Sequence, residues 1–133
     1  PLWLPASTGP SNRPDTAYPA RELAAAALHD WQQVTPCPLR YVVGPTFEAG
    51  MVAVYGGGRA AVVDSGDLTR VPWIDATDLA AAGAIHIQMP VPAEALRQGQ
   101  LDMDLPSNHG LRHETIRWSI VPPRSSGDCN RMQ

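Results

Sequence analysis

Residues 39–88 constrain the fold of this chain more than any other stretch. Short apolar runs rich in β-branched residues alternate there with longer, Ala-rich runs of amphipathic spacing. The short runs are typical of strands and the longer runs of helices. This alternation indicates a βαβαβ unit, in which the strands run parallel. We therefore expect an α/β fold: a three-layer, Rossmann-like, mostly parallel sheet of four or five strands with helices on both faces.

The strands are expected where apolar residues are continuous or alternate. Continuous runs, as at 39–43, indicate strands that are buried on both faces. At 101–105 apolar residues alternate with acids, which indicates a half-exposed edge strand. The expected strands are 39–43, 60–63, 84–89, 101–105 and 115–121, with one or two helical turns at 92–98 and a loop at 107–113.

The first helix is expected from Pro19 to Val34, because Pro suits the first turn of a helix. One face carries an apolar stripe with Trp31 as a core anchor, while Asp30 faces away from it. Pro36 and Pro38 end the helix.

Two further helices are expected between the parallel strands. Thr46 can cap the second, which would turn an apolar face of Phe47, Met51 and Val54 to the core before the glycines at 56–58 stop it. Asp75 is the expected N-cap of the third, around Leu79, and Gly83 ends it at the expected position.

Length and composition favour a single domain. The chain has 133 residues, enough to bury a hydrophobic core. Residues 1–17 are Pro-, Ser- and Asn-rich and indicate a linker, 18–123 form the domain, and 124–133 form a flexible tail. The abrupt start at Pro1 has two readings: a fragment cut just after a hydrophobic region, or an ordinary frayed terminus.

The charge pattern argues against nucleic acid as a partner. The formal net charge is −3, and the ten basic residues are all Arg and show no cluster. Nucleic acids and anionic membrane surfaces select basic patches instead.

The two cysteines, Cys37 and Cys129, leave two alternatives. If the strands beside them are neighbours, a disulfide would tie the C-terminus to the sheet; otherwise they are two unrelated thiols. No metal site is expected, because the cysteines and the four histidines lack metal-ligand spacing. No cofactor is expected either.

Candidate ligand-binding residues follow the parallel strands. Ligands bind open α/β sheets at the carboxyl ends of the strands, and several acids are expected there. The alternative is that these acids only cap helices and shape turns. The candidates are Thr46, Glu48, Asp64, Asp67, Trp73 and Asp75.

Familiar catalytic motifs are missing from the sequence. Gly44 and Asp64 have about the spacing of a dinucleotide site, but Pro45 removes a backbone donor and Phe47 adds bulk where a pyrophosphate would lie. There is no Walker loop and no nucleophile elbow. His86, on an expected strand, is interpreted as a core histidine rather than a catalyst.

A set of short motifs, in a fixed order, carries a family resemblance. They are Tyr-Pro-Ala-Arg-Glu-Leu-Ala from Tyr18, Trp31, Pro-Leu-Arg-Tyr-Val-Val-Gly from Pro38, Glu-Ala-Gly-Met-Val-Ala-Val-Tyr from Glu48, Val-Pro-Trp-Ile-Asp from Val71, Gly-Ala-Ile from Gly83, and Ile-Arg-Trp-Ser-Ile-Val-Pro-Pro from Ile116. Together they resemble the C-terminal soluble domain of bacterial polytopic membrane glycosyltransferases. These belong to the dolichyl-phosphate-mannose protein mannosyltransferase and aminoarabinose-transferase-like group, whose fold is of the GT-C kind.

The resemblance implies a role beside a membrane-embedded enzyme. In that family the donor is a polyprenyl-phosphate sugar, and the catalytic acids lie between transmembrane helices that this sequence does not contain. The implied function is a non-catalytic accessory domain on the periplasmic side of the inner membrane. Its implied partners are the transmembrane portion of the same polypeptide and a lipid-linked sugar or an acceptor. The resemblance also favours the Cys37–Cys129 disulfide.

Two other functions stay open. The chain could be a stand-alone ligand-binding domain or small enzyme that uses the carboxyl edge of the strands. It could also be an interaction scaffold, with Trp73 and Trp118 as exposed anchors.

Overall fold

The computed structural model describes residues 17–64 and 75–124, without the side chains of residues 17 and 18. The expected linker at 1–17 therefore lies almost entirely outside the described residues, and so does the expected tail apart from Arg124. The elements are α1 (Ala17–Val34), β2 (Tyr41–Gly44), α2 (Thr46–Tyr55), β3 (Ala61–Asp64), α3 (Ala76–Ala82), β4 (Ala84–Ile87), β5 (Arg97–Ser107) and β6 (Gly110–Val121).

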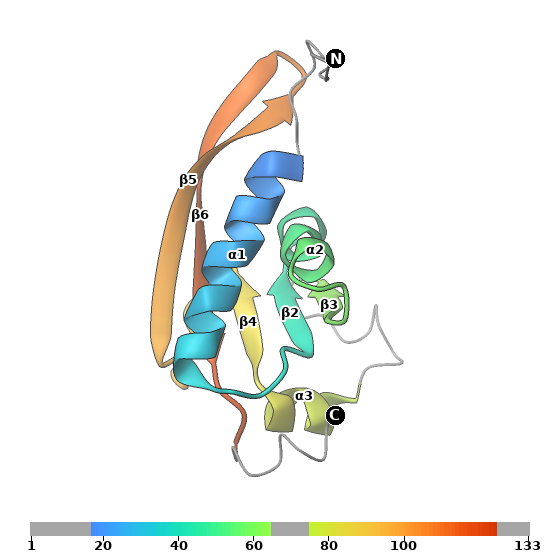
Figure 1. Cartoon of the computed structure of the whole chain (residues 1–133), viewed down its shortest axis with the longest axis vertical. Coiled ribbons are helices and arrows are strands. Elements are labelled where there is room, and N and C mark those ends of the chain that lie inside the picture. Colours follow the sequence, from blue (N-terminus) through green and yellow to red (C-terminus); the bar gives the residue numbers. More distant parts are fainter. Residues whose placement is uncertain (1–16, 65–74, 125–133) are drawn as a thin grey trace, which may run out of the picture.

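The strands form one sheet in the order β3-β2-β4-β6-β5 (Figure 1). Strand β2 lies between β3 and β4 and runs parallel to both, whereas β6 is antiparallel to both β4 and β5. The expected α/β class and number of strands are confirmed. The sheet is mixed rather than mostly parallel, because the last two strands form a hairpin, and a hairpin can only join antiparallel strands.

The hairpin is longer than expected. Ser107 and Gly110 are the last paired residues, so only Asn108 and His109 form the turn, and the loop expected at 107–113 was wrong. Gly110, with φ at +109°, accommodates the tight reversal. The helical turns expected at 92–98 were also wrong, since β5 already begins at Arg97. Within β6, only the last four residues, Trp118–Val121, pair with β4.

The first face of the sheet is covered by α1 and α2, which lie side by side (Figure 1). Alternate strand residues point to this face, because successive side chains of a strand point to opposite faces. The cluster that they form with the two helices is the larger core. Its largest fully buried members are Leu23, Trp31, Val42, Val52, Ile85, Ile87, Ile116 and Ile120.

The second face is covered only in part. The seven residues of α3 pack at one end, where Ala82 joins Tyr41, Val43, Val63 and Ala84 in a smaller core. Figure 1 shows α3 at the end of the sheet, below the parallel strands. Among the described residues, no helix lies over the second face of β5 and β6, so the complete third layer that we expected is not formed by them.

Two assignments of helix faces need correction. Trp31 is buried as expected, and its indole N–H donates to the carbonyl of Cys37 (2.8 Å). Asp30, expected to face away from the core, is only 8% exposed. Its carboxylate accepts from Arg97 Nε (2.6 Å) and from Trp118 Nε1 (2.8 Å), so the hairpin supplies the charge and the donor that allow its burial.

Helix α2 is also rotated relative to the expected face. Ala49, Val52 and Ala53 are buried, together with the expected Met51, whereas Phe47 and Val54 are 57% and 64% exposed. Helix α1 packs against α2, and the buried residues of α2 belong to the larger core. The expected cap is wrong as well: the N-cap is Pro45, without a side-chain cap, and Thr46 is the first helical residue.

Candidate functional site

Three of the predicted ligand-binding residues lie near one edge of the sheet. β2 and β3 end together, with Gly44 paired to Asp64, and Thr46 and Glu48 follow in the first turn of α2. Thr46 is exposed, and Glu48 and Asp64 are half-buried. This is the carboxyl edge of the parallel strands, as the sequence predicted.

Asp75 lies away from this group. It caps α3 by accepting from the backbone N–H of Thr77 (2.8 Å), as expected. Asp78, in the first turn of α3, accepts a hydrogen bond from the hydroxyl of Tyr41 and forms an ion pair with Arg40 (2.9 Å). Tyr41 begins β2, so α3 starts beside the amino ends of the parallel strands. Asp67 and Trp73 lie outside the described residues, and ligand binding by the six residues stays a prediction.

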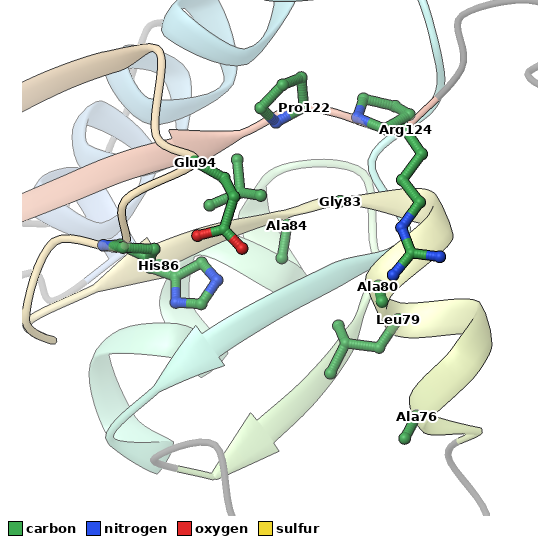
Figure 2. A pocket seen from close by; sticks show the side chains of 12 residues that line it. Ala76, Leu79, Ala80, Gly83, Ala84, His86, Glu94, Pro122 and Arg124 are labelled. Atoms are coloured by element: carbon green, nitrogen blue, oxygen red, sulfur yellow. The ribbon is translucent and has the colours of Figure 1, made fainter.

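The cavity beside α3, which we call the α3 cavity, was not predicted. Its volume is about 520 Å³, within the usual range for small-molecule sites. Proline, alanine and leucine side chains form most of its wall, and polar groups come from β4, the β4–β5 connection and the end of the described chain. The lining residues are Ala76, Leu79, Ala80, Gly83, Ala84, His86, Pro92, Glu94, Val121, Pro122, Pro123 and Arg124 (Figure 2).

The polar groups of the α3 cavity lie at two places. Figure 2 shows the Glu94 carboxylate near the His86 imidazole, with Arg124 beside α3 at the other end. The backbone N–H of Arg124 donates to Ala81 O (3.0 Å), which holds this residue against α3. The cavity therefore offers a negative group and a positive group, separated by an apolar wall.

Burial lowers the pKa of His86 below its usual value, and the Glu94 charge opposes that shift. The imidazole is therefore neutral at pH 7 and can both donate and accept a hydrogen bond. Its expected place in the core is only partly right: His86 is half-buried and lines a cavity. Glu94 and Arg124 were not predicted as site residues, because their segments come together only when β6 pairs with β4.

His86 and Ser119 do not form a nucleophile–base pair. They are register partners on β4 and β6, but no hydrogen bond joins their side chains in the described part of the molecule, and Ser119 does not line the α3 cavity. A serine nucleophile would need a base within hydrogen-bond reach.

Trp118, expected as an exposed anchor of an interaction scaffold, is 4% exposed and hydrogen-bonded to Asp30. It therefore cannot serve as a surface anchor. The second anchor, Trp73, lies outside the described residues.

Cys37 is buried, and the described residues contain no free cysteine thiol. Cys129 lies outside the described residues, so the Cys37–Cys129 pairing stays a prediction. Within residues 17–64 and 75–124, no three His, Cys, Asp or Glu side chains are grouped so as to hold a metal ion. No helix in these ranges is both long and apolar enough to cross a bilayer.

Comparisons with known proteins found no relative of this chain. No protein-family model matches the chain. No curated protein and no solved structure was found to be similar to it.

Proposed function

We propose that this chain is a non-catalytic periplasmic accessory domain of a bacterial membrane glycosyltransferase that uses a polyprenyl-phosphate sugar. The proposal starts from the ordered motifs that resemble the C-terminal soluble domain of that group. Its partners would be the transmembrane portion of the same polypeptide and a lipid-linked sugar or an acceptor. Its place would be the periplasmic side of the inner membrane.

One observation carries the proposal: the most buried carboxylate of the described residues joins elements rather than facing a cavity. Asp30 connects α1 to Arg97 and Trp118 of the hairpin. Similarly, Asp78 connects α3 to Arg40 and Tyr41 at the start of β2. Charged groups used in this way fix the packing of a module, which is what an accessory domain requires.

The glycines of the motifs support the same reading. A Cβ at Gly44 would collide with the carbonyl oxygen of Ile87, and a Cβ at Gly83 would collide with that of Val121. Gly83 also has φ at +74°, which favours glycine. These two motif positions therefore allow β2, β4 and β6 to approach closely. Along the chain, β2 precedes both of its neighbours in the sheet, and we propose that β3-β2-β4 corresponds to half of a Rossmann-like sheet.

The exposed apolar side chains of α2 are consistent with a neighbouring partner. Phe47 and Val54 lie seven residues apart, about two helical turns, and both point to solvent. Large apolar side chains gathered on one helix face often mark contact surfaces. We propose that this face meets the membrane-embedded portion of the enzyme.

The coding sequence before Pro1 provides the first test. Several predicted membrane spans in the same reading frame are expected, and a gene without them would overturn the proposal. In the whole enzyme, Phe47→Ser with Val54→Ser should reduce sugar transfer from a polyprenyl-phosphate donor. The isolated variant domain should keep its stability, because both side chains are exposed. Leu96→Ser with Leu111→Ser, two exposed apolar positions outside α2, is the matched control.

The α3 cavity favours a second candidate function, a ligand-binding α/β domain. It combines an apolar wall with a carboxylate, a neutral imidazole and a guanidinium. A thermal-shift screen of the chain with nucleotides, sugars and amino acids tests this candidate, because a ligand that binds the native state raises the melting temperature. A stabilising ligand whose effect disappears in Glu94→Gln and Arg124→Gln would support it. No stabilisation by any compound would count against it.

A further inference from the structure

A second cavity lies on the open second face of the sheet, between the β5–β6 hairpin and the β4–β5 connection. We call it the hairpin cavity. Its volume is about 310 Å³, enough for one small molecule. It shares no lining residue with the α3 cavity. The lining residues are Met89, Val91, Gln98, Gly99, Gln100, Arg117, Trp118 and Ser119.

Strand alternation shows which side chains face this cavity. Met103 of β5 and Ile116 and Trp118 of β6 point into the larger core on the first face. Gln98 and Gln100 of β5, and Arg117 and Ser119 of β6, therefore point to the second face. The pairing places Gln98 opposite Ser119 and Gln100 opposite Arg117, so the four polar side chains form two adjacent rows.

Ser119 is the most unusual of these residues. It is 2% exposed, and its hydroxyl makes no hydrogen bond to another described residue. Its register partner on the other side, His86, does not bond to it either. Buried hydroxyls in native proteins almost always have a partner. Because Ser119 lines the hairpin cavity, a molecule bound there would supply the missing partner.

Arg117 is exposed and has no ion pair within residues 17–64 and 75–124. Arg112, on the same strand, is paired with Glu114. The planar guanidinium has the geometry to bind a carboxylate or a phosphate with two parallel hydrogen bonds. The hairpin cavity thus has an anion-binding group at its open side and an unsatisfied hydroxyl at its buried side.

The remaining walls match a sugar ring. Each carboxamide of Gln98 and Gln100 offers an acceptor and two donors, which suits hydroxyl groups that both donate and accept. Met89 and Val91 provide apolar contact for the C–H bonds of a ring. The same cavity wall is held in shape by Gln88, whose side-chain oxygen accepts from the backbone N–H of Arg117 (3.0 Å).

We propose that the hairpin cavity binds an acidic monosaccharide, that is, a sugar ring that carries a phosphate or a carboxylate. Arg117 binds the acidic group, Gln98 and Gln100 bind ring hydroxyls, and Ser119 bonds to the most deeply placed hydroxyl. This inference uses the cavity alone and does not require the chain to belong to a glycosyltransferase.

The test is an NMR titration of the whole chain with four probes: glucose 1-phosphate, glucuronate, glucose and inorganic phosphate. Either acidic sugar should shift the amide resonances of Gln98, Gln100 and Ser119, and should bind more tightly than glucose or inorganic phosphate. Arg117→Gln should weaken binding by about tenfold or more, because it removes a charge-assisted hydrogen bond. Ser119→Ala should also weaken binding, while the free chain stays folded.

Arg112→Gln is the matched control, since it removes an arginine from the same strand outside the cavity. Binding should be unchanged in this variant. The proposal is overturned if neither acidic sugar shifts the cavity resonances at millimolar concentration. An equal loss of affinity in Arg117→Gln and Arg112→Gln would overturn it as well. So would an affinity for glucose or for inorganic phosphate equal to that for the acidic sugars.

Discussion

The indole N–H of Trp118 donates a hydrogen bond of 2.8 Å to the carboxylate of Asp30, 88 positions away in the chain. This bond crosses from the hairpin to α1 and is buried. The same carboxylate pairs with Arg97 Nε at 2.6 Å. One side chain of α1 therefore holds both strands of the hairpin.

Asp30→Ala should lower the free energy of unfolding by about 2–4 kcal/mol. The change removes the acceptor of a buried indole N–H and the partner of Arg97 together. Urea denaturation followed by tryptophan fluorescence measures the loss. Asp102→Ala, which removes an exposed carboxylate bonded to Thr115, is the control and should cost about 0.5 kcal/mol or less. Equal losses in the two variants would contradict the assigned role of Asp30.

Gly99→Ala should also destabilise the chain, by about 1–3 kcal/mol. A Cβ at this position would lie 2.5 Å from Asp30 Oδ2 and 2.6 Å from Trp118 Nε1, so the bond between them would have to move. Gly50→Ala is the matched control, because nothing lies within 4 Å of its added Cβ. Gly50 lies inside α2, where alanine should increase stability by about 0.5–1 kcal/mol. In the same denaturation assay, Gly99→Ala should lower the free energy of unfolding and Gly50→Ala should raise it.

Tyr41 should ionise at unusually high pH. Burial, followed by its hydrogen bond to Asp78 and the charge of that carboxylate, raises the pKa of Tyr41 to about 12. An ordinary tyrosine in the unfolded chain has a pKa of about 10. The unfolded state therefore loses its proton first, so the stabilisation is complete below pH 10 and is lost as the pH rises towards 12.

Ultraviolet absorbance of phenolate during a pH titration, compared between the native chain and Tyr41→Phe, assigns this transition. Tyr55→Phe is the control variant. A native transition that is lost in Tyr41→Phe but begins at pH 10 would contradict the prediction.

His86 should make the chain less stable in mild acid. Burial lowers the pKa of His86 below 6.5, with Glu94 opposing the change. The unfolded state then binds a proton at higher pH than the native state does, so stability is complete above about pH 6.5 and falls below it. Glu94→Gln should lower the pKa of His86 further, which an NMR titration of the imidazole measures. An unchanged or raised pKa in that variant would show that the two groups do not interact as described.

The predicted Cys37–Cys129 disulfide can be tested chemically. Denatured, unreduced chain should contain no reactive thiol, and reduction should expose two and lower the free energy of unfolding by about 2–4 kcal/mol. The double variant Cys37→Ala with Cys129→Ala should not respond to the reductant. Thiol reactivity of the untreated native chain would contradict the pairing.

Local signals predicted the local structure well. Asp75 and Gly83 delimit α3 as expected, because N-cap and C-cap chemistry depends on a few neighbouring residues. Apolar runs likewise located β2, β3 and β4 to within two residues, and they located the end of β6 but not its start. The exceptions depend on distant partners. Asp30 is buried because the hairpin packs against it, and no pattern within α1 could reveal that contact.

The candidate sites were predicted less well for the same reason. Glu48 and Asp64 do lie near one sheet edge, since the ends of adjacent parallel strands follow from topology. Both cavities, however, depend on β6 returning antiparallel beside β4, and on the β4–β5 connection lying next to the hairpin. The loop expected at 107–113 hid the length of that hairpin.

Because β4 is short, the two halves of the hairpin differ in how much of the sheet supports them. Beyond Trp118 towards the tip, β6 no longer pairs with β4, and α1 lies beside the hairpin (Figure 1). Met103 and Leu105 of this outer half belong to the larger core, to which α1 also contributes. In that half, α1 rather than a neighbouring strand supports β6. We therefore expect thermal opening to begin at Asn108 and His109 and to progress towards the sheet. Amide protons should accordingly exchange with deuterium in a gradient along β5, fastest near Ser107 and slowest near Gly99.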